Sequence, residues 1–433
     1  MMCHYQIPYH KSSLSLNIPE KNVHYYIDLE FPPSEKGNKD ILSEAFNQSE
    51  TVSLEEFVRD KRVGLIVEDA TRDVPLKDLL DVSCSVLQKA KSVKVFVATG
   101  THDGDNEEDH KIVDLIKGSQ EKFGYPLENI IVNNCHEDSF YLAGITSGIH
   151  NEIFVHNESR DIEVFLIFSD MKNHYFAGYS NPIKNIIPGI CNYSTAEQNH
   201  ALALKDKSTF GHHPLHPDPQ RRDNPLAKDM WEAYQLICAG RPTYVLATIS
   251  KKGKVLWSSA GLLERVTELG IREVDRTMSR EVVPTDKLIV SCGGYPNDES
   301  LYTAQRALEL SKFGIKKGGE ILFLAGCGNG LRPEKSVNNF YNPLREDITK
   351  ILSKLNEKYI MYSHKTYKFA RLIEQMDQIF MVSELSADLI KKIHLSPVKN
   401  VQSVVDRWIE DDPQTSIGIV TDGNKLALHK KIS

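Results

Sequence analysis

The segment from His174 to His200 gathers residue types that do chemistry in a setting that is otherwise apolar and rich in turns. It reads HYFAGYSNPIKNIIPGICNYSTAEQNH, so that one lysine, Lys184, lies among aromatic, glycine, proline and isoleucine residues, with a histidine at each end. A lysine in apolar surroundings has a lowered pKa and becomes a nucleophile, as covalent attachment of a ligand requires. Imidazole serves as a metal ligand or as a proton-transfer group. Taken alone, however, His174 would be no more than a hydrogen-bonded histidine.

Polar side chains also follow three apolar runs that are expected to form strands. They are Asp69, Thr71 and Arg72 after residues 63–67, His102 after residues 93–97, and Asp170, Lys172 and His174 after residues 164–168. In a parallel sheet these turns all leave from the carboxyl edge, and open α/β sheets bind ligands at that edge, near a switch in strand order. The sequence therefore predicts one crevice that collects these side chains.

Two of these residues have ordinary alternatives. Arg72 either pairs with Asp69 or Asp73 in a solvated charge cluster, or it grips a phosphate or carboxylate. His102 either bonds its own backbone in the turn or transfers protons. The spacing alone leaves both choices open.

The histidines between His212 and His216, in HHPLH, suggest a zinc site only at first sight. The ligands are too close together, and the prolines break the helix that normally orders such triplets. A structural metal in this segment is therefore a minor hypothesis.

The elements that position these residues alternate between strands and helices. The expected strands are residues 25–29, 63–67, 93–97, 130–132, 164–168, 244–248, 288–290 and 320–324. The expected helices are residues 76–90, 107–116, 224–238 and 299–310. Such alternation is typical of parallel sheets covered on both faces.

The pattern restarts after a predicted linker at residues 277–284, and a chain of 433 residues is too long for one ordinary core. We therefore expect an α/β protein of two Rossmann-like domains with mostly parallel sheets, residues 1–277 and 278–433, and an active site in the cleft between them. A return of the last roughly 20 residues to the first domain remains open, because boundaries are the weakest part of such predictions.

Composition narrows the functional class. The net charge of −7 argues against a general nucleic-acid surface, without excluding a small anionic substrate. No secretory h-region and no bilayer-length apolar run is present in the sequence, so no membrane partner is expected. The seven cysteines form no CxxC pair, which favours reduced thiols and a cytoplasmic location.

Five stretches together resemble the nickel-pincer lactate racemase family. They are DATRDVP, ATGTH, the span from His174 through Lys184 to His200, NPLAKDM, and SCGGYPNDESLYTAQRAL. The likeness runs from about residue 60 to about residue 330, and more loosely to the end of the chain. The spacing from His174 through Lys184 to His200 is its specific part.

The resemblance implies a cofactor, the nickel-pincer nucleotide, which is pyridinium-3,5-bisthiocarboxylic acid mononucleotide carrying Ni(II). Lys184 matches the lysine that tethers it through a thioamide, and His200 matches the remaining nickel ligand. Nickel with sulfur, carbon and imidazole donors favours a square-planar arrangement. Asp69, Thr71 and Arg72 match the turn that holds the ribose and phosphate. Cofactor-biosynthesis proteins are the implied partners.

The implied activity is racemisation or epimerisation of a 2-hydroxy acid by proton-coupled hydride transfer, with His102 and His174 matching the acid/base pair. One imidazole takes the hydroxyl proton of one enantiomer while hydride leaves its α-carbon. Hydride returns to the other face of the 2-keto acid, and the second imidazole serves the mirror product. Two groups are expected because proton transfer needs hydrogen-bond reach.

The chain departs from the family pattern in the second domain. Tyr302, Thr303 and Arg306 stand where the pattern has Tyr, Gln and a Lys that meets the substrate carboxylate. Tyr302 and Arg306 share a helix face, and Arg306 still grips a carboxylate, although it is no neutral replacement for lysine. We therefore expect a substrate other than lactate, such as a larger or polyhydroxylated acid. The insertion HHPLHPDPQRRD would then enlarge or line the site.

Two other hypotheses are considered. A nicotinamide-dependent 2-hydroxy acid dehydrogenase fits a two-domain α/β plan, but EDATRDV after the first strand lacks GxGxxG. A non-catalytic nickel- or nucleotide-binding homologue has no need of both His102 and His174.

Overall fold

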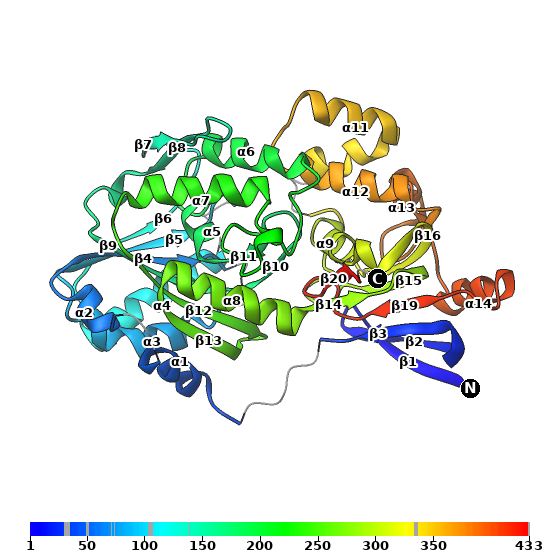
Figure 1. The fold of residues 1–433 in the computed structure, drawn as a ribbon, viewed down its shortest axis with the longest axis horizontal. Coiled ribbons are helices and arrows are strands. Elements are labelled where there is room, and N and C mark those ends of the chain that lie inside the picture. The colour runs from blue at the N-terminus through cyan, green and yellow to red at the C-terminus, as the bar shows by residue number, and fades with distance from the viewer. Residues whose placement is uncertain are drawn as a thin grey trace. The chain divides into compact units, whose positions relative to one another are not determined.

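The computed structural model describes residues 1–29, 35–48, 52–70, 72, 74–102, 107–137, 139–332 and 337–431 (Figure 1). Two compact units are present. The central unit is Phe31–Arg276, and the terminal unit joins Met1–Glu30 to Thr277–Ser433. Residues 1–30, which the sequence analysis assigned to the first domain, thus belong with the C-terminal residues, because strand β3 pairs in parallel with strand β19.

The central unit is built on a six-stranded sheet in the order β13-β12-β9-β4-β5-β6. The strands are β4 (Arg62–Glu68), β5 (Ser92–Ala98), β6 (Leu127–Val132), β9 (Val164–Asp170), β12 (Thr243–Lys251) and β13 (Lys254–Leu262). All neighbours are parallel except β13, which is antiparallel to β12. The strand order runs outward in both directions from β4, so the switch point lies at the carboxyl ends of β4 and β9.

Helices and short hairpins surround this sheet. The helices are α1 (Asn38–Asn47), α2 (Leu54–Val58), α3 (Leu76–Leu87), α4 (Glu107–Phe123), α5 (Pro182–Ile186), α6 (Tyr193–Ala201), α7 (Pro225–Cys238) and α8 (Leu263–Met278). The hairpin strands are β7 (Phe140–Ile145) with β8 (Glu152–His156), and β10 (Lys172–His174) with β11 (Gly178–Ser180).

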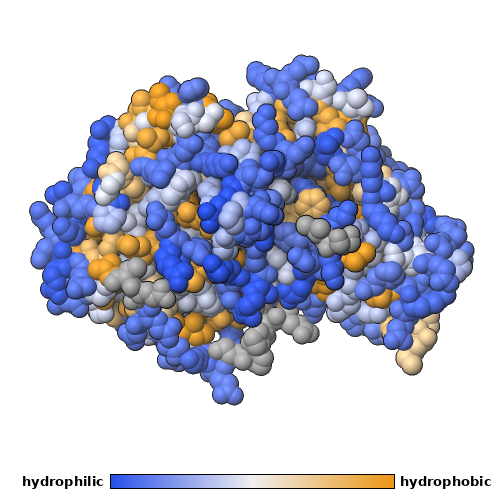
Figure 2. Space-filling model, in the orientation of Figure 1, coloured by the Kyte–Doolittle hydropathy of each residue, from blue (hydrophilic) through white to orange (hydrophobic). Residues whose placement is uncertain are grey.

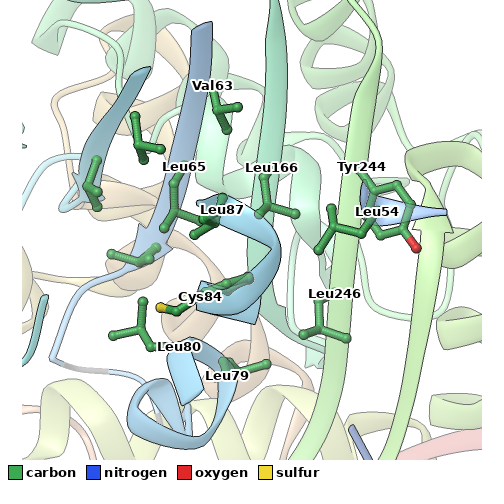
Figure 3. Close-up of a cluster of buried hydrophobic side chains, with 14 of the residues drawn as sticks. Leu54, Val63, Leu65, Leu79, Leu80, Cys84, Leu87, Leu166, Tyr244 and Leu246 are labelled. Carbon is green, nitrogen blue, oxygen red and sulfur yellow. The ribbon is translucent and has the colours of Figure 1, made fainter. Parts of the chain in front are cut away.

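The core of the central unit lies between α3 and the sheet (Figure 3). Leu79, Leu80 and Cys84 project from α3 toward Leu65 of β4 and Leu166 of β9, and all five are essentially unexposed. The helical spacing of the apolar residues in α3 produces this buried face. Every residue of β9 is buried, in keeping with the continuous apolar run at residues 164–168 in a sheet covered on both sides.

The terminal unit contains a second six-stranded sheet, all parallel, in the order β18-β17-β16-β15-β19-β3. Its strands are β3 (Val23–Ile27), β15 (Thr285–Ser291), β16 (Ile315–Leu324), β17 (Gln378–Val382), β18 (Ser396–Pro397) and β19 (Ile417–Val420). Its helices are α9 (Leu301–Ser311), α11 (Ile348–Glu357), α12 (Ser363–Gln375), α13 (Ala387–Lys392) and α14 (Val401–Asp411).

Two strand pairs complete the terminal unit. They are the hairpin of β1 (Met2–Tyr9) with β2 (Ser12–Pro19), and the parallel pair of β14 (Ser279–Val282) with β20 (Ala427–Lys430). The last two strands of the chain therefore pair within this unit. The predicted α/β class with two mostly parallel, Rossmann-like sheets is confirmed.

Hydrophilic residues cover most of the face seen in Figure 2, in keeping with a mean hydropathy of −0.36. Exposed apolar side chains on and beside the β7–β8 hairpin include Leu142, Ile145 and Ile149. Within the described residues, no helix combines the length and the apolar character needed to cross a bilayer. All seven cysteines are free thiols.

Candidate active site

His102 and Asp69 form a close pair at the carboxyl ends of β5 and β4. The Nδ1 atom of His102 lies 2.6 Å from Oδ2 of Asp69, whose side chain is buried while that of His102 is 42% exposed. A carboxylate only accepts hydrogen bonds, so Nδ1 carries the proton and donates. In the neutral ring, Nε2 therefore holds a lone pair that is suited to accept a proton.

His174, at the end of β10, is held in the opposite way. Its Nδ1 accepts a hydrogen bond from the backbone N–H of Ala177 at 3.2 Å. Because Nδ1 is the acceptor, the proton of the neutral ring resides on Nε2. His102 and His174 thus differ in tautomer: Nε2 of His102 is a proton acceptor, and Nε2–H of His174 is a hydrogen-bond donor.

His200 lies near the end of α6 and is 8% exposed. Its Nδ1 donates to the carbonyl oxygen of Ala196, one turn earlier, at 2.8 Å. This bond orients the ring and leaves the lone pair of the neutral imidazole on Nε2, which is the arrangement found in metal-binding histidines.

A buried carboxylate that the sequence analysis missed fastens the helix of His200. Asp229 of α7 accepts hydrogen bonds from Thr146 Oγ1 at 2.7 Å, Asn151 Nδ2 at 3.0 Å and Asn199 Nδ2 at 2.9 Å. Asn199 directly precedes His200, so this network fixes α6 against α7. The signal in the sequence was a carboxylate on the otherwise apolar face of the NPLAKDM helix.

Lys184 lies on α5, which begins at Pro182 with Asn181 as its cap; the Asn181 side chain accepts from the backbone N–H of Ile183 at 2.9 Å. Burial lowers the pKa of Lys184 to about 7, the positive charge of Arg72 adds to this, and the carboxylate of Glu68 opposes it. Among the described residues, none forms a hydrogen bond or ion pair with the amine. A large fraction of the amine is therefore neutral near pH 7.

The ring of Phe176 brings together the three predicted residues of the segment. Phe176 is 3% exposed and meets the ring of His174 edge-on at 4.5 Å and the ring of His200 at 5.4 Å between centroids. The Nζ atom of Lys184 lies 5.9 Å from the same ring centroid. The sequence analysis did not single out Phe176, although it stands two residues after His174.

A cavity of about 320 Å³ opens beside the carboxyl end of β4, and its lining includes Glu68, Asp69 and Arg72. The backbone N–H of Arg72 donates to the carbonyl of Asp69 at 3.2 Å, which closes the turn. Thr71 lies outside the described residues. A cavity of this size suits part of a small organic ligand.

The three predicted substrate-binding residues lie on α9 in the terminal unit, whereas the other candidates belong to the central unit. Arg306 Nε donates to the carbonyl of Thr303 at 3.2 Å. The Nζ of Lys365 lies 3.0 Å from the ring centroid of Tyr302, and burial raises the pKa of the Tyr302 hydroxyl. The cation on Lys365 was not anticipated from the sequence.

The histidines of the insertion each bind a different group. His212 Nδ1 lies 2.7 Å from Asp223 Oδ1, His213 Nε2 lies 3.4 Å from Asn181 Nδ2, and His216 Nε2 lies 3.1 Å from Asp275 Oδ2. His213 therefore contacts the residue that caps the helix of Lys184. In the described ranges, no three His, Cys, Asp or Glu side chains converge as a metal site.

The carboxylate of Asp275 also binds Arg221 at 2.6 Å and the hydroxyl of Tyr179 at 2.6 Å. Gly178, beside Tyr179, has φ of +81°, and a Cβ there would lie 2.0 Å from the carbonyl oxygen of His212. The insertion is thus fastened to β11 and α8 by packing and by charge.

Comparison with known proteins identifies relatives along nearly the whole chain. Two family models match, the lactate racemase N-terminal domain over residues 9–211 and the lactate racemase C-terminal domain over residues 280–426. A protein named lactate racemase from Thermoanaerobacterium thermosaccharolyticum is 24% identical over 452 residues, covering 99% of this chain and 100% of the relative. One of the same name from Lactiplantibacillus plantarum is 24% identical over 385 residues, covering 86% of each.

Two solved structures share the fold. The lactate racemase apoprotein from T. thermosaccharolyticum superposes with a TM-score of 0.85 at 20% identity, covering 99% of this chain and 100% of that one. A Thermotoga maritima protein superposes with a TM-score of 0.61 at 14% identity, covering 94% and 100%.

Proposed function

Because the chain belongs to the lactate racemase family and is therefore a racemase, we propose that it inverts the α-carbon of a 2-hydroxy acid with a nickel-pincer nucleotide held by Lys184 and His200. When bound, this cofactor supplies the hydride acceptor and the metal centre; the protein orients and polarises. The observation that carries the proposal is the convergence of His174, Lys184 and His200 on Phe176.

The residues at the site suit such a group. His200 presents the unprotonated Nε2 that a metal needs, and Ala196 keeps its other nitrogen engaged. The Lys184 amine, with a pKa of about 7 and no ion-pair partner among the described residues, is available to form a covalent bond. Asp69 and Arg72 border the cavity where a ribose and phosphate would bind, Arg72 as the cationic partner of the phosphate.

The opposite tautomers of His102 and His174 fit an inversion. His102 Nε2 accepts the hydroxyl proton of the substrate, and the charge that develops on the ring is stabilised by Asp69 at 2.6 Å. On the other face, His174 Nε2–H donates a hydrogen bond to the keto oxygen; giving up a proton would require the imidazolium form of this ring, because a neutral ring that lost Nε2–H would become an imidazolate. Proton exchange with solvent returns both rings to their neutral states after each turnover.

We assign the substrate carboxylate to Arg306, assisted by Tyr302 and Thr303. The guanidinium binds a carboxylate through two parallel hydrogen bonds, which a lysine does not provide. Since Thr303 and Arg306 replace the glutamine and lysine of the family pattern, the preferred substrate is a larger or polyhydroxylated 2-hydroxy acid rather than lactate.

Mass spectrometry and metal analysis test the proposal. Protein purified with its cofactor should contain about one nickel per chain, and the adduct should map to Lys184. A Lys184→Ala variant should lose adduct, nickel and racemisation, whereas Lys207→Ala, at a lysine that is 70% exposed, should retain all three. An adduct on another residue, or racemisation by metal-free protein, would refute the proposal. Turnover without added NAD distinguishes it from a dehydrogenase.

A further inference from the structure

Glu68 is a buried carboxyl group that the proposed racemisation leaves unused. It is the last residue of β4, at the switch point of the sheet, and it is 7% exposed. Its Oε1 accepts hydrogen bonds from the Ser169 hydroxyl at 3.1 Å and the Asp170 backbone N–H at 3.2 Å. Its Oε2 is buried, and within the described residues it has no hydrogen-bond partner. Buried polar atoms are nearly always paired, so this orphan oxygen requires an explanation.

Lys184 is held beside the same strand ends. Helix α5 packs against both β4 and β9. Asn185, the residue after Lys184, donates from Nδ2 to the Phe168 carbonyl at 2.9 Å, which fixes α5 at the carboxyl end of β9. The negative charge of Glu68 raises the pKa of the Lys184 amine, although no ion pair joins the two groups.

Burial and the neighbouring charges bring the pKa values of Glu68 and Lys184 close to each other. Burial raises the pKa of Glu68 to about 7, with Arg72 and Lys172 opposing the rise and Asp170 adding to it. The pKa of Lys184 is lowered to about 7, first by burial and then by Arg72. Groups with matched pKa values near the working pH are efficient at passing protons.

We propose that Glu68 is the acid–base group through which Lys184 acquires its cofactor, an inference that rests on the proposed function. As Nζ bonds to the thioacid carbon of the cofactor, the nitrogen passes a proton through a bridging water to Oε2 of Glu68, because no direct ion pair joins the two groups. Glu68 then gives this proton to the oxygen that leaves the same carbon, and with a second proton from solvent that oxygen departs as water. One C–N bond forms, one C–O bond breaks, and no oxidant or reductant is consumed.

The first test measures the coupling without cofactor. Apoprotein is exposed to trace acetic anhydride between pH 5 and 9, and acetylation of the Lys184 peptide is quantified by mass spectrometry; its rate follows the neutral amine. The wild-type midpoint is expected at about 7. Since the carboxylate holds the proton on the amine, Glu68→Gln should lower the midpoint by about one pH unit.

The second test measures attachment. Apoprotein is mixed with the free nickel-loaded nucleotide at pH 7, and the intact mass is followed over time. Glu68→Gln should attach the cofactor about 100-fold more slowly, even though its amine is less protonated. A purely structural role does not predict a more neutral amine together with slower attachment.

Two variants serve as controls. Glu68→Asp keeps the charge, so its acetylation midpoint should stay near that of the wild type and its attachment should be partly restored. Glu163→Gln makes the same change at the far end of β4, where Glu163 accepts from the Arg62 backbone N–H at 3.1 Å, and should alter neither measurement.

The proposal is overturned if Glu68→Gln keeps the wild-type acetylation midpoint or attaches the cofactor at the wild-type rate. If no mass increase maps to Lys184 in the wild type, the tether itself is refuted. Failure of the tether can be distinguished from failure of the Glu68 proposal, because the acetylation profile of Lys184 is measured without the cofactor.

Discussion

Replacing Asp69 with asparagine tests whether the tautomer of His102 matters for turnover. The short bond between Asp69 Oδ2 and His102 Nδ1, 2.6 Å long, places the ring proton on Nδ1 and stabilises the imidazolium that forms during proton transfer. An asparagine of the same shape carries no charge. It either accepts the same hydrogen bond more weakly, or it turns its amide toward Nδ1 and favours the tautomer whose Nε2 is already protonated.

The size of the effect follows from the bond that is weakened. A hydrogen bond to a charged group contributes about 1.5–3 kcal/mol, and each 1.36 kcal/mol changes a rate about tenfold. Losing it in the transition state would therefore slow turnover by about 10- to 150-fold. The His102 side chain is 42% exposed, and solvent screens such a pair. We expect a loss of about 10- to 30-fold in kcat/KM.

The assay is racemisation of whichever 2-hydroxy acid the holoenzyme turns over fastest, followed by chiral chromatography from both stereoisomers. The equilibrium constant fixes the ratio of kcat/KM in the two directions, so the substitution must slow both by the same factor. Nickel content and the Lys184 adduct are measured in parallel, and kcat/KM is expressed per loaded chain, so that slower proton transfer is separated from weaker cofactor binding.

The chain contains a matched control. Asp223 holds His212 Nδ1 at 2.7 Å in a pair of the same geometry outside the candidate site. Asp223→Asn should therefore keep wild-type kcat/KM. If the kcat/KM of Asp69→Asn stays within about twofold of the wild type, or if Asp223→Asn lowers kcat/KM by as much as Asp69→Asn does, the reasoning on the His102 tautomer is wrong.

Three further substitutions have defined outcomes. His213→Asn should weaken the fall of the free energy of unfolding at acid pH. Burial lowers the pKa of His213 to about 3, so below about pH 6.5 the unfolded wild type binds a proton that the folded state does not, and its free energy of unfolding falls by up to about 1.4 kcal/mol per pH unit toward pH 3. The same fall in both proteins, measured by urea titrations across this pH range, would contradict the prediction. Asp275→Asn should cost about 2–3 kcal/mol of unfolding free energy, because Arg221 and His216 lose their shared partner; a urea midpoint equal to that of the wild type would argue against it. Arg306→Lys should raise KM about tenfold with nickel content unchanged, since a lysine cannot form the two parallel bonds; an unchanged KM would remove Arg306 from the substrate site.

The alternating elements of both sheets could be predicted from the sequence because buried parallel strands are short continuous apolar runs. The runs at residues 63–67, 93–97 and 164–168 became β4, β5 and β9, and the helix expected at residues 224–238 became α7. The course of the first 30 residues was not predictable in this way. Their partner in the sheet, β19, lies almost 400 residues away in the chain, and no local pattern encodes that pairing.

Helix α8 was missed for a different reason. The segment that looked like the start of a linker is the end of this helix, Leu263–Met278, whose many charged residues conceal a narrow apolar face. The hairpin of β7 and β8 was missed because its exposed apolar residues break the alternation that identifies a half-buried strand. In both elements the tertiary context, rather than local propensity, decides the structure.

Spacing found the residues that could react, but not the groups that set their protonation. The partner of His200 is a backbone carbonyl, and that of His174 is a backbone N–H, so neither has a sequence signature. His102 is oriented by a side chain, that of Asp69, which the sequence analysis had assigned to the nucleotide. Because a backbone partner cannot be removed by substitution, the proton positions of His174 and His200 are fixed by the fold itself, whereas that of His102 depends on one replaceable carboxylate. The tautomer of His102 can therefore be changed at Asp69, where replacing a single atom of the side chain alters which nitrogen of the imidazole is basic.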